Sequence, residues 1–279
     1  MALGTLVEAF SLASAFGGDA VVPSGAADPI LPSALSGLRN WYKANNWTLT
    51  TPGAALQTWV DAGGTKDLAG ITASPLIDAT GVPAFNGTTE TIHDSTGTPP
   101  NTPTNANGLF WVVAKVRTFT SGRWLFSFGR HNSSTRFIGL MQITSGGTNY
   151  WGFRHRIAGS ASTTWHAGLV ANSAQYLGLG VYSDGSLLYS ITTAATKAEL
   201  VLEGALGSAG VSDFFDTHGG TPPNQVGGAV LRANNANVAS TFSDCLIYDF
   251  GFIGGTRTDA ELEGFRQYLI QQAAVAQAL

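Results

Sequence analysis

Apolar runs and strand-like alternation dominate the chain from about residue 43 to residue 255. The most apolar run is GLFWVVAKV at 108–116, nine residues that contain a single charge. A membrane-spanning helix needs about 20 apolar residues. A shorter run that is rich in Val, Phe and Trp and is preceded by Asn107 is typical of a buried strand. The pattern therefore predicts an all-β protein in which residues 108–116 form a core strand.

The same reasoning predicts a series of further strands. They are expected at 82–92 (broken at Asn86-Gly87), 124–129, 136–143, 150–159, 226–233 and 242–253. Residues 176–191 predict two strands that are joined at Asp184-Gly185, because this dipeptide favours the positive φ of a hairpin turn. No fixed period recurs along the chain, which argues against solenoids and propellers.

The two ends of the chain have helical or mixed patterns. Thr258 is followed three residues later by Glu261, which is the pattern of a capping box. Leu262, Phe265, Leu269 and Ala273 recur at helical spacing, so a helix is predicted over 258–276. Residues 33–43, SALSGLRNWYK, predict a short helix or turn.

Residues 1–33 predict a separate N-terminal arm, rich in Ala, Gly and Ser, in front of one domain over 34–279. Four apolar residues of the arm lie on one helix face: Leu3, Leu6, Val7 and Phe10. Such an arm is too short to bury its own apolar residues, so we expect it to dock on a partner or on another copy of the chain. The alternative is an unattached terminus, but apolar residues of this kind are depleted in disordered segments.

Composition narrows the classes of partner. Only 11% of the residues are charged, against about 25% in an ordinary soluble domain; this suits short strands and tight turns, or a surface that other subunits cover. A net charge of −4 argues against nucleic acid as a partner. The arm has no basic region of a secretory signal and the chain has no apolar span of membrane length, so no membrane partner is expected. Cys245 is the only cysteine and is expected to be a small buried hydrophobe.

The order of motifs resembles a known domain family. LSGLRNWYKANN, LQTWVDAGGTKDLAG and GVPAFNGT near the start, and STFSDCLIYDFGFIGGTRTDAELEGFRQYL near the end, resemble concanavalin A-like (laminin-G-like) jelly-roll domains of phage and bacterial proteins. The resemblance covers about residues 34–275. It implies a concanavalin A-like jelly-roll sandwich of two antiparallel sheets, in which the neighbouring strands and the facing sheet cover residues 108–116. With the arm and the terminal helix added, this is the predicted fold.

Metal and catalytic chemistry have little support in the sequence. Members of the family often bind calcium through an Asp near one rim, but no Asp-x-Asp cluster occurs among Asp61, Asp67, Asp184 and Asp244. Calcium is left as an open alternative, and otherwise neither a metal nor a cofactor is expected. Retaining glycosidases need two carboxylates about 5–5.5 Å apart. The nearest spaced pair, Glu199 and Glu203, is expected to face solvent, so no enzymatic activity is predicted.

Aromatic and cationic side chains are the remaining candidates for recognition. Side chains alternate along a strand, so Trp151 and Phe153 should face the core while Tyr150, Arg154 and Arg156 share the outward face. Trp165 is expected in the loop that follows. Tyr150, Arg154, Arg156 and Trp165 form the candidate ligand site, and the alternative is that the aromatic residues belong to the core or to an interface.

Two functional hypotheses follow from these features. The first is a non-enzymatic structural protein of a phage virion, a capsid decoration, head-fibre or tail-fibre subunit whose arm docks it to capsid or tail subunits and which forms a homo-oligomer. The second is a carbohydrate-binding adhesin or receptor-binding protein that contacts cell-surface glycan. The two roles are compatible, because an exposed decoration protein can also bind sugar.

Overall fold

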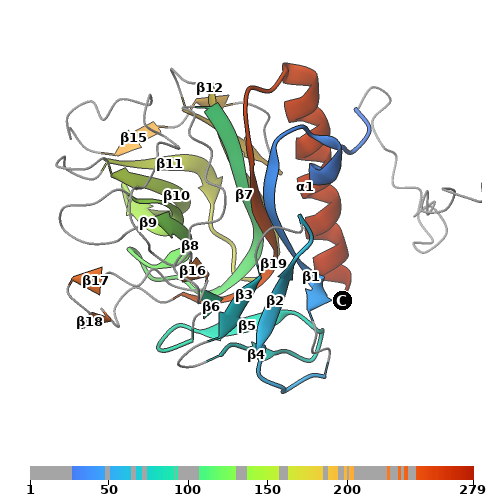
Figure 1. Ribbon diagram of the computed structural model, residues 1–279. Coiled ribbons are helices and arrows are strands. Elements are labelled where there is room, and N and C mark those ends of the chain that lie inside the picture. The colour runs from blue at the N-terminus through green and yellow to red at the C-terminus, as the bar shows by residue number, and fades with distance from the viewer. Residues whose placement is uncertain are drawn as a thin grey trace, which may run out of the picture.

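The structure, a computed structural model, describes residues 27–47, 51–63, 67–70, 74–90, 92–93, 107–129, 137–156, 163–184, 188–193, 198–199, 201–203, 225–226, 232–233, 236–237 and 243–279. Within these ranges the strands form two antiparallel layers, and a long C-terminal helix covers the outer face of one of them (Figure 1). The predicted fold class, an all-β sandwich with a terminal helix, is confirmed. None of the helices in the described part of the chain combines the length and hydropathy needed to cross a membrane.

The first layer is built around the two longest paired strands. In spatial order it contains β2 (Thr58–Asp61), β1 (Leu38–Trp47), β19 (Asp244–Gly254), β7 (Asn107–Thr118), β12 (Leu177–Asp184), β13 (Leu188–Thr192) and β14 (Ala198–Glu199). The start of β19 also pairs with β5 (Pro83–Asn86), which pairs in turn with β4 (Leu76–Ile77). Strands β12 and β13 form the predicted hairpin, whose turn residues 185–187 lie outside the described residues.

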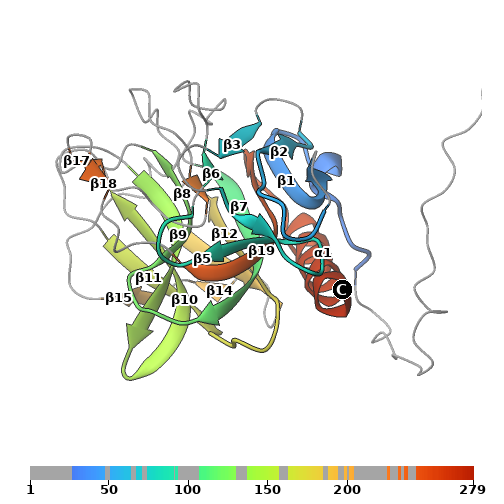
Figure 2. The same cartoon turned by 90° about the horizontal axis from the view of Figure 1, so that it is seen from below.

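The second layer lies on the far side of the core from the helix (Figure 2). It contains β8 (Trp124–Gly129), β9 (Phe137–Ser145), β10 (Thr148–Arg156), β11 (Thr163–Val170) and β15 (Val201–Glu203). Three short strands join the two layers at one edge: β3 (Leu68–Gly70), β6 (Ile92–His93) and β16 (Gln225–Val226). A separate two-stranded ladder consists of β17 (Arg232–Ala233) and β18 (Ala236–Asn237).

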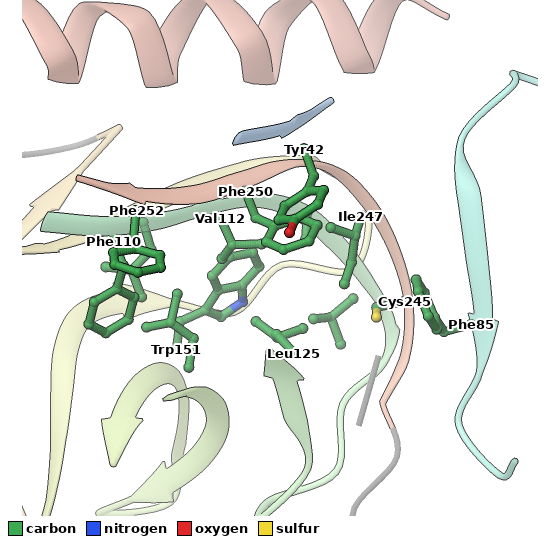
Figure 3. Close-up of a cluster of buried hydrophobic side chains, with 14 of the residues drawn as sticks. Tyr42, Phe85, Phe110, Val112, Leu125, Trp151, Cys245, Ile247, Phe250 and Phe252 are labelled. Atoms are coloured by element: carbon green, nitrogen blue, oxygen red, sulfur yellow. The ribbon is translucent and has the colours of Figure 1, made fainter. Parts of the chain in front are cut away.

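Strand β7 explains the apolar run at 108–116, because both of its faces are buried. Phe110 and Val112 point into the core between the layers, beside Trp151 and Phe252 (Figure 3). The alternate side chains, such as Trp111, point to the other side and pack under the helix. Burial of one side chain of this size contributes about 1.5–3 kcal/mol. The sequence predicted that the facing sheet covers one face of this strand. The C-terminal helix covers the other face.

The helix α1 (Asp259–Ala278) begins with the predicted capping box. The Thr258 hydroxyl accepts a hydrogen bond from the Glu261 backbone N–H at 3.2 Å, and the Glu261 carboxylate accepts one from the Thr258 N–H at 2.7 Å. Leu262, Phe265 and Leu269 are fully buried on the first layer. The helix lies mainly over β12, with smaller contacts to β7, β13 and β19.

The expectation of a short helix or turn over 33–43 is wrong for most of that segment. A 3₁₀ turn, η2 (Pro32–Ala34), is followed by β1 from Leu38 onward. Tyr42 faces the inner core and stacks on Phe250 at 4.6 Å, whereas Trp41 faces the helix and meets Tyr268 edge-on at 6.2 Å. Successive side chains therefore pack on opposite sides, as a strand requires, and pairing with β19 determines this conformation.

Two further expectations fall partly outside the described residues. The predicted strand at 226–233 corresponds only to the end of β16 and to β17, and residues 227–231 lie outside the described residues. The docking residues Leu3, Leu6, Val7 and Phe10 also lie outside them. The arm is described from residue 27, and there the Ile30 N–H donates a hydrogen bond of 2.9 Å to the Gly264 carbonyl of α1.

Candidate functional site

The predicted ligand site on β10 is only partly brought together. Tyr150 and Arg154 lie on the outward face, because the alternate residues Trp151 and Phe153 are buried in the inner core. Tyr150 is half-buried against Trp124, Met141 and Ile143 on that outward face. Arg154 is also half-buried, and its burial lowers the pKa of the guanidinium. Arg156 is the last residue of β10 and pairs with Phe137. Its position in the strand, two residues after Arg154, is on the outward face.

The placement of Trp165 in a loop is wrong. Trp165 lies within β11, directly opposite Phe153 of β10. Directly paired residues lie on the same face of a sheet, so the position of Trp165 shares the face of Phe153 and not that of Tyr150. The sequence missed this because β11 begins with two threonines and follows a Gly- and Ser-rich stretch.

A polar pocket lies instead where β5, β7 and β19 meet the start of β8. It has a volume of about 180 Å³ and is lined by Asn86, Gly87, Thr118, Thr120, Arg123 and Asp244. We call it the Asp244 pocket. A cavity needs only about 10–15 Å³ to hold one water molecule, so the pocket has room for several waters or for a small polar ligand.

The Asn86-Gly87 turn forms one wall of the Asp244 pocket. The Asn86 side-chain oxygen accepts hydrogen bonds from the backbone N–H groups of Thr88 and Thr89, at 2.9 and 3.0 Å, which fixes the turn that follows β5. Gly87 has a φ of +73°, and a Cβ there would lie 3.0 Å from Asp244. Glycine is therefore needed both for the turn and for its close approach to β19. The predicted break of the strand at this dipeptide is confirmed.

The carboxylate of Asp244 is held by its neighbours on β7. Arg117 donates to its Oδ1 at 2.7 Å, and the Thr118 hydroxyl donates to its Oδ2 at 2.6 Å. Arg117 also donates to the Phe85 carbonyl at 2.8 Å, which ties β7 to β5. Next to this group, burial raises the pKa of Glu90, against the lowering effects of the Asn86 N–H and the Arg117 charge.

A buried polar network supports the opposite wall. Gln142 and Ser243 are both fully buried. The Gln142 side chain accepts from the Thr120 N–H at 2.8 Å and donates to the Ser243 hydroxyl at 2.9 Å. Ser243 donates in turn to the Trp124 carbonyl at 2.6 Å. The network fixes residues adjacent in sequence to Arg123 and Asp244, so the two sides of the pocket are held at a defined separation.

The pocket contains both hydrogen-bond donors and hydrogen-bond acceptors. In the part of the chain that the structure describes, no group of three or more His, Cys, Asp or Glu side chains is placed to hold a metal ion. Cys245, next to Asp244, is fully buried, and burial raises the pKa of its thiol. It is therefore an unreactive core residue, as predicted. Glu199 and Glu203 lie on different strands, β14 and β15.

Comparison with known proteins identifies a fold and no family. No protein-family model and no curated protein sequence matches the chain. Domain 4 of AbnA, a GH43 extracellular arabinanase from Geobacillus stearothermophilus solved with arabinotriose, is similar with a TM-score of 0.53 and 14% identity, over 85% of this chain and 98% of that domain. An arabinofuranosidase solved with arabinofuranosyl-α-1,2-xylobiose has a TM-score of 0.50 and 12% identity, over 89% of this chain and 62% of its own.

A sialidase from Trypanosoma rangeli has a TM-score of 0.49 and 12% identity over 88% of this chain. The chain spans only 36% of the length of that sialidase. At such identities a structural match establishes the β-sandwich fold alone.

Proposed function

We propose that this chain is a non-catalytic carbohydrate-binding β-sandwich and that it holds one sugar unit of a glycan in the Asp244 pocket. The observation that carries the proposal is the lining of that pocket, which combines a carboxylate, a guanidinium, an amide and two hydroxyls around a space of about 180 Å³. Sugar hydroxyls donate and accept hydrogen bonds at once, so they need this mixture. The likeness to a domain solved with arabinotriose over 98% of that domain's length supports it.

The test is a glycan array probed with the parent chain and with two variants. Thr120→Trp fills the pocket from an exposed position, so it should abolish binding while the melting temperature changes little. Tyr150→Ala removes the aromatic ring from the outward face of β10 and should leave binding unchanged. The opposite result, with loss of binding only in Tyr150→Ala, would move the site to β10. Absence of binding to every glycan would overturn the proposal.

A second, compatible proposal is that the chain acts as a structural protein of a phage virion, as a capsid decoration, head-fibre or tail-fibre subunit. The favouring observation is that the described end of the arm is hydrogen-bonded to α1 through Ile30, on the far side of the core from β8–β11 (Figures 1 and 2). An arm that leaves from the helix side can attach to a capsid or tail subunit while the opposite layer faces outward. Mass spectrometry of purified particles tests this, and absence of the chain from them would contradict it.

A further inference from the structure

Arg123 differs from Arg117 and Asp244 beside it, because no described residue forms a hydrogen bond or an ion pair with its side chain. Its Nη1 atom is buried, and among the described residues no hydrogen-bond acceptor lies within reach. Arg123 also forms no ion pair of 4.0 Å or less with the described acidic residues. A buried N–H of a charged group without an acceptor is unfavourable. Because Arg123 also lines the pocket, an acceptor on a ligand in the pocket can pair with its guanidinium.

The other charged groups at the Asp244 pocket have protein partners. Arg117 and Asp244 form an ion pair at 2.7 Å, with side-chain exposures of 40% and 29%, and thereby balance each other at the rim. The Glu90 carboxylate beside them accepts a hydrogen bond from the Asn86 N–H at 2.6 Å. Of the charged side chains that line the pocket, Arg123 is therefore the one without a partner among the described residues.

We infer that the sugar bound in the Asp244 pocket carries a carboxylate, as a uronic acid does, and that this carboxylate pairs with Arg123. The inference rests on the proposed function and names the class of its ligand. A planar carboxylate matches the fork of N–H donors on a guanidinium. Thr120 lines the same pocket, and the Thr118 hydroxyl, which donates to Asp244, can still accept a hydrogen bond from a ring hydroxyl. A neutral sugar would occupy the same space but leave the Arg123 charge without a partner.

The experiment uses an array that contains neutral oligosaccharides together with uronic-acid and other carboxylate-bearing ones. The full chain is compared with Arg123→Gln, which removes the charge, and with Arg266→Gln as the matched control. Arg266 lies on α1 and pairs with Glu263 at 3.0 Å, so that control removes one positive charge away from the pocket. The strongest acidic ligand is then measured by calorimetry beside its methyl ester, which keeps the ring and removes the charge.

We expect the bound glycans to be carboxylate-bearing, with affinity about tenfold or more weaker for the methyl ester and for Arg123→Gln. Arg266→Gln should bind as the parent does, and the melting temperature of Arg123→Gln should stay near that of the parent. Equal affinity for acid and ester, or binding of neutral glycans alone, would overturn this inference and leave the proposed function intact. Binding to no glycan at all would overturn both.

Discussion

Asp249 shows how one residue couples the sheet to the helix. Its side chain is fully buried, and its carboxylate accepts hydrogen bonds from the indole N–H groups of Trp41 at 3.1 Å and Trp111 at 3.0 Å, and from the Tyr268 hydroxyl. These donors come from two strands and from α1. Burial of the carboxylate nevertheless outweighs the donors and raises the pKa of Asp249 to about 6.

This shift predicts a stability that depends on pH. Between the ordinary pKa of 3.8 and the folded value of about 6, the folded protein keeps a proton that the unfolded chain has released. The stabilisation from this proton is therefore full below about pH 4 and is lost as the pH rises to about 6, by up to about 3 kcal/mol. Urea unfolding at a series of pH values measures the loss.

Asp249→Asn is the control for that pH dependence. The amide keeps an oxygen for the two indoles but does not titrate, so the difference in unfolding free energy between parent and variant should change across this pH range. A difference that stays constant from pH 4 to pH 6 would show that another group is responsible.

At the scale of elements, the burial of strand β7 could be predicted and its partners could not. The composition of the run 108–116 predicts a buried strand, and in the structure both of its faces are buried. The sequence does not show that the outer face lies under α1, since that contact joins residues more than 130 positions apart, such as Trp111 and Phe265 with ring centroids 5.2 Å apart. Strand β1 was missed for the same reason, because its conformation depends on pairing with β19.

The helix α1 should stabilise the domain mainly through its buried face and less through its cap. Phe265 is fully buried, so Phe265→Ala should lower the free energy of unfolding by about 3–5 kcal/mol. Thr258→Ala, which removes the side-chain acceptor of the capping box, should lower it by about 1 kcal/mol. Denaturant unfolding of both variants checks this. Equal losses in the two variants would mean that the Phe265 side chain packs loosely.

The contact between α1 and the end of the arm predicts that Gly264→Ala has opposite effects on stability in the presence and in the absence of residues 1–30. Alanine is a better helix former than glycine by about 1 kcal/mol, but a Cβ on Gly264 would lie 2.5 Å from two carbons of the Ile30 side chain. Gly264→Ala should therefore destabilise the full chain and stabilise a chain that lacks residues 1–30. The measurement is thermal unfolding of the full chain and of the 1–30 deletion, each with and without Gly264→Ala. A stability change of the same sign in both chains would mean that Ile30 does not pack against Gly264.

At the scale of the whole molecule, the Asp244 pocket could not be predicted from local sequence patterns. Its walls come from residues 86–87, 118–123 and 244, which no sequence period connects. The break at Asn86-Gly87 and the polar end of the 108–116 run each marked a strand terminus. Pairing of β19 with both β5 and β7 is what brings these termini together. The residues on β10 were predicted together because they share one strand.

The arm gives the last prediction, and the structure determines where the cut should fall. The Ile30 N–H donates a hydrogen bond to the Gly264 carbonyl. Deletion of residues 1–30 would therefore remove a contact with α1 as well as the arm, and would lower the stability of the domain. Deletion of residues 1–26 removes the predicted docking face Leu3, Leu6, Val7 and Phe10 and keeps the contact with α1. We expect this shorter deletion to preserve the melting temperature while it abolishes oligomerisation in solution or attachment to the particle. Light scattering and particle co-sedimentation measure the two, and normal assembly by the truncated chain would show that the arm does not dock.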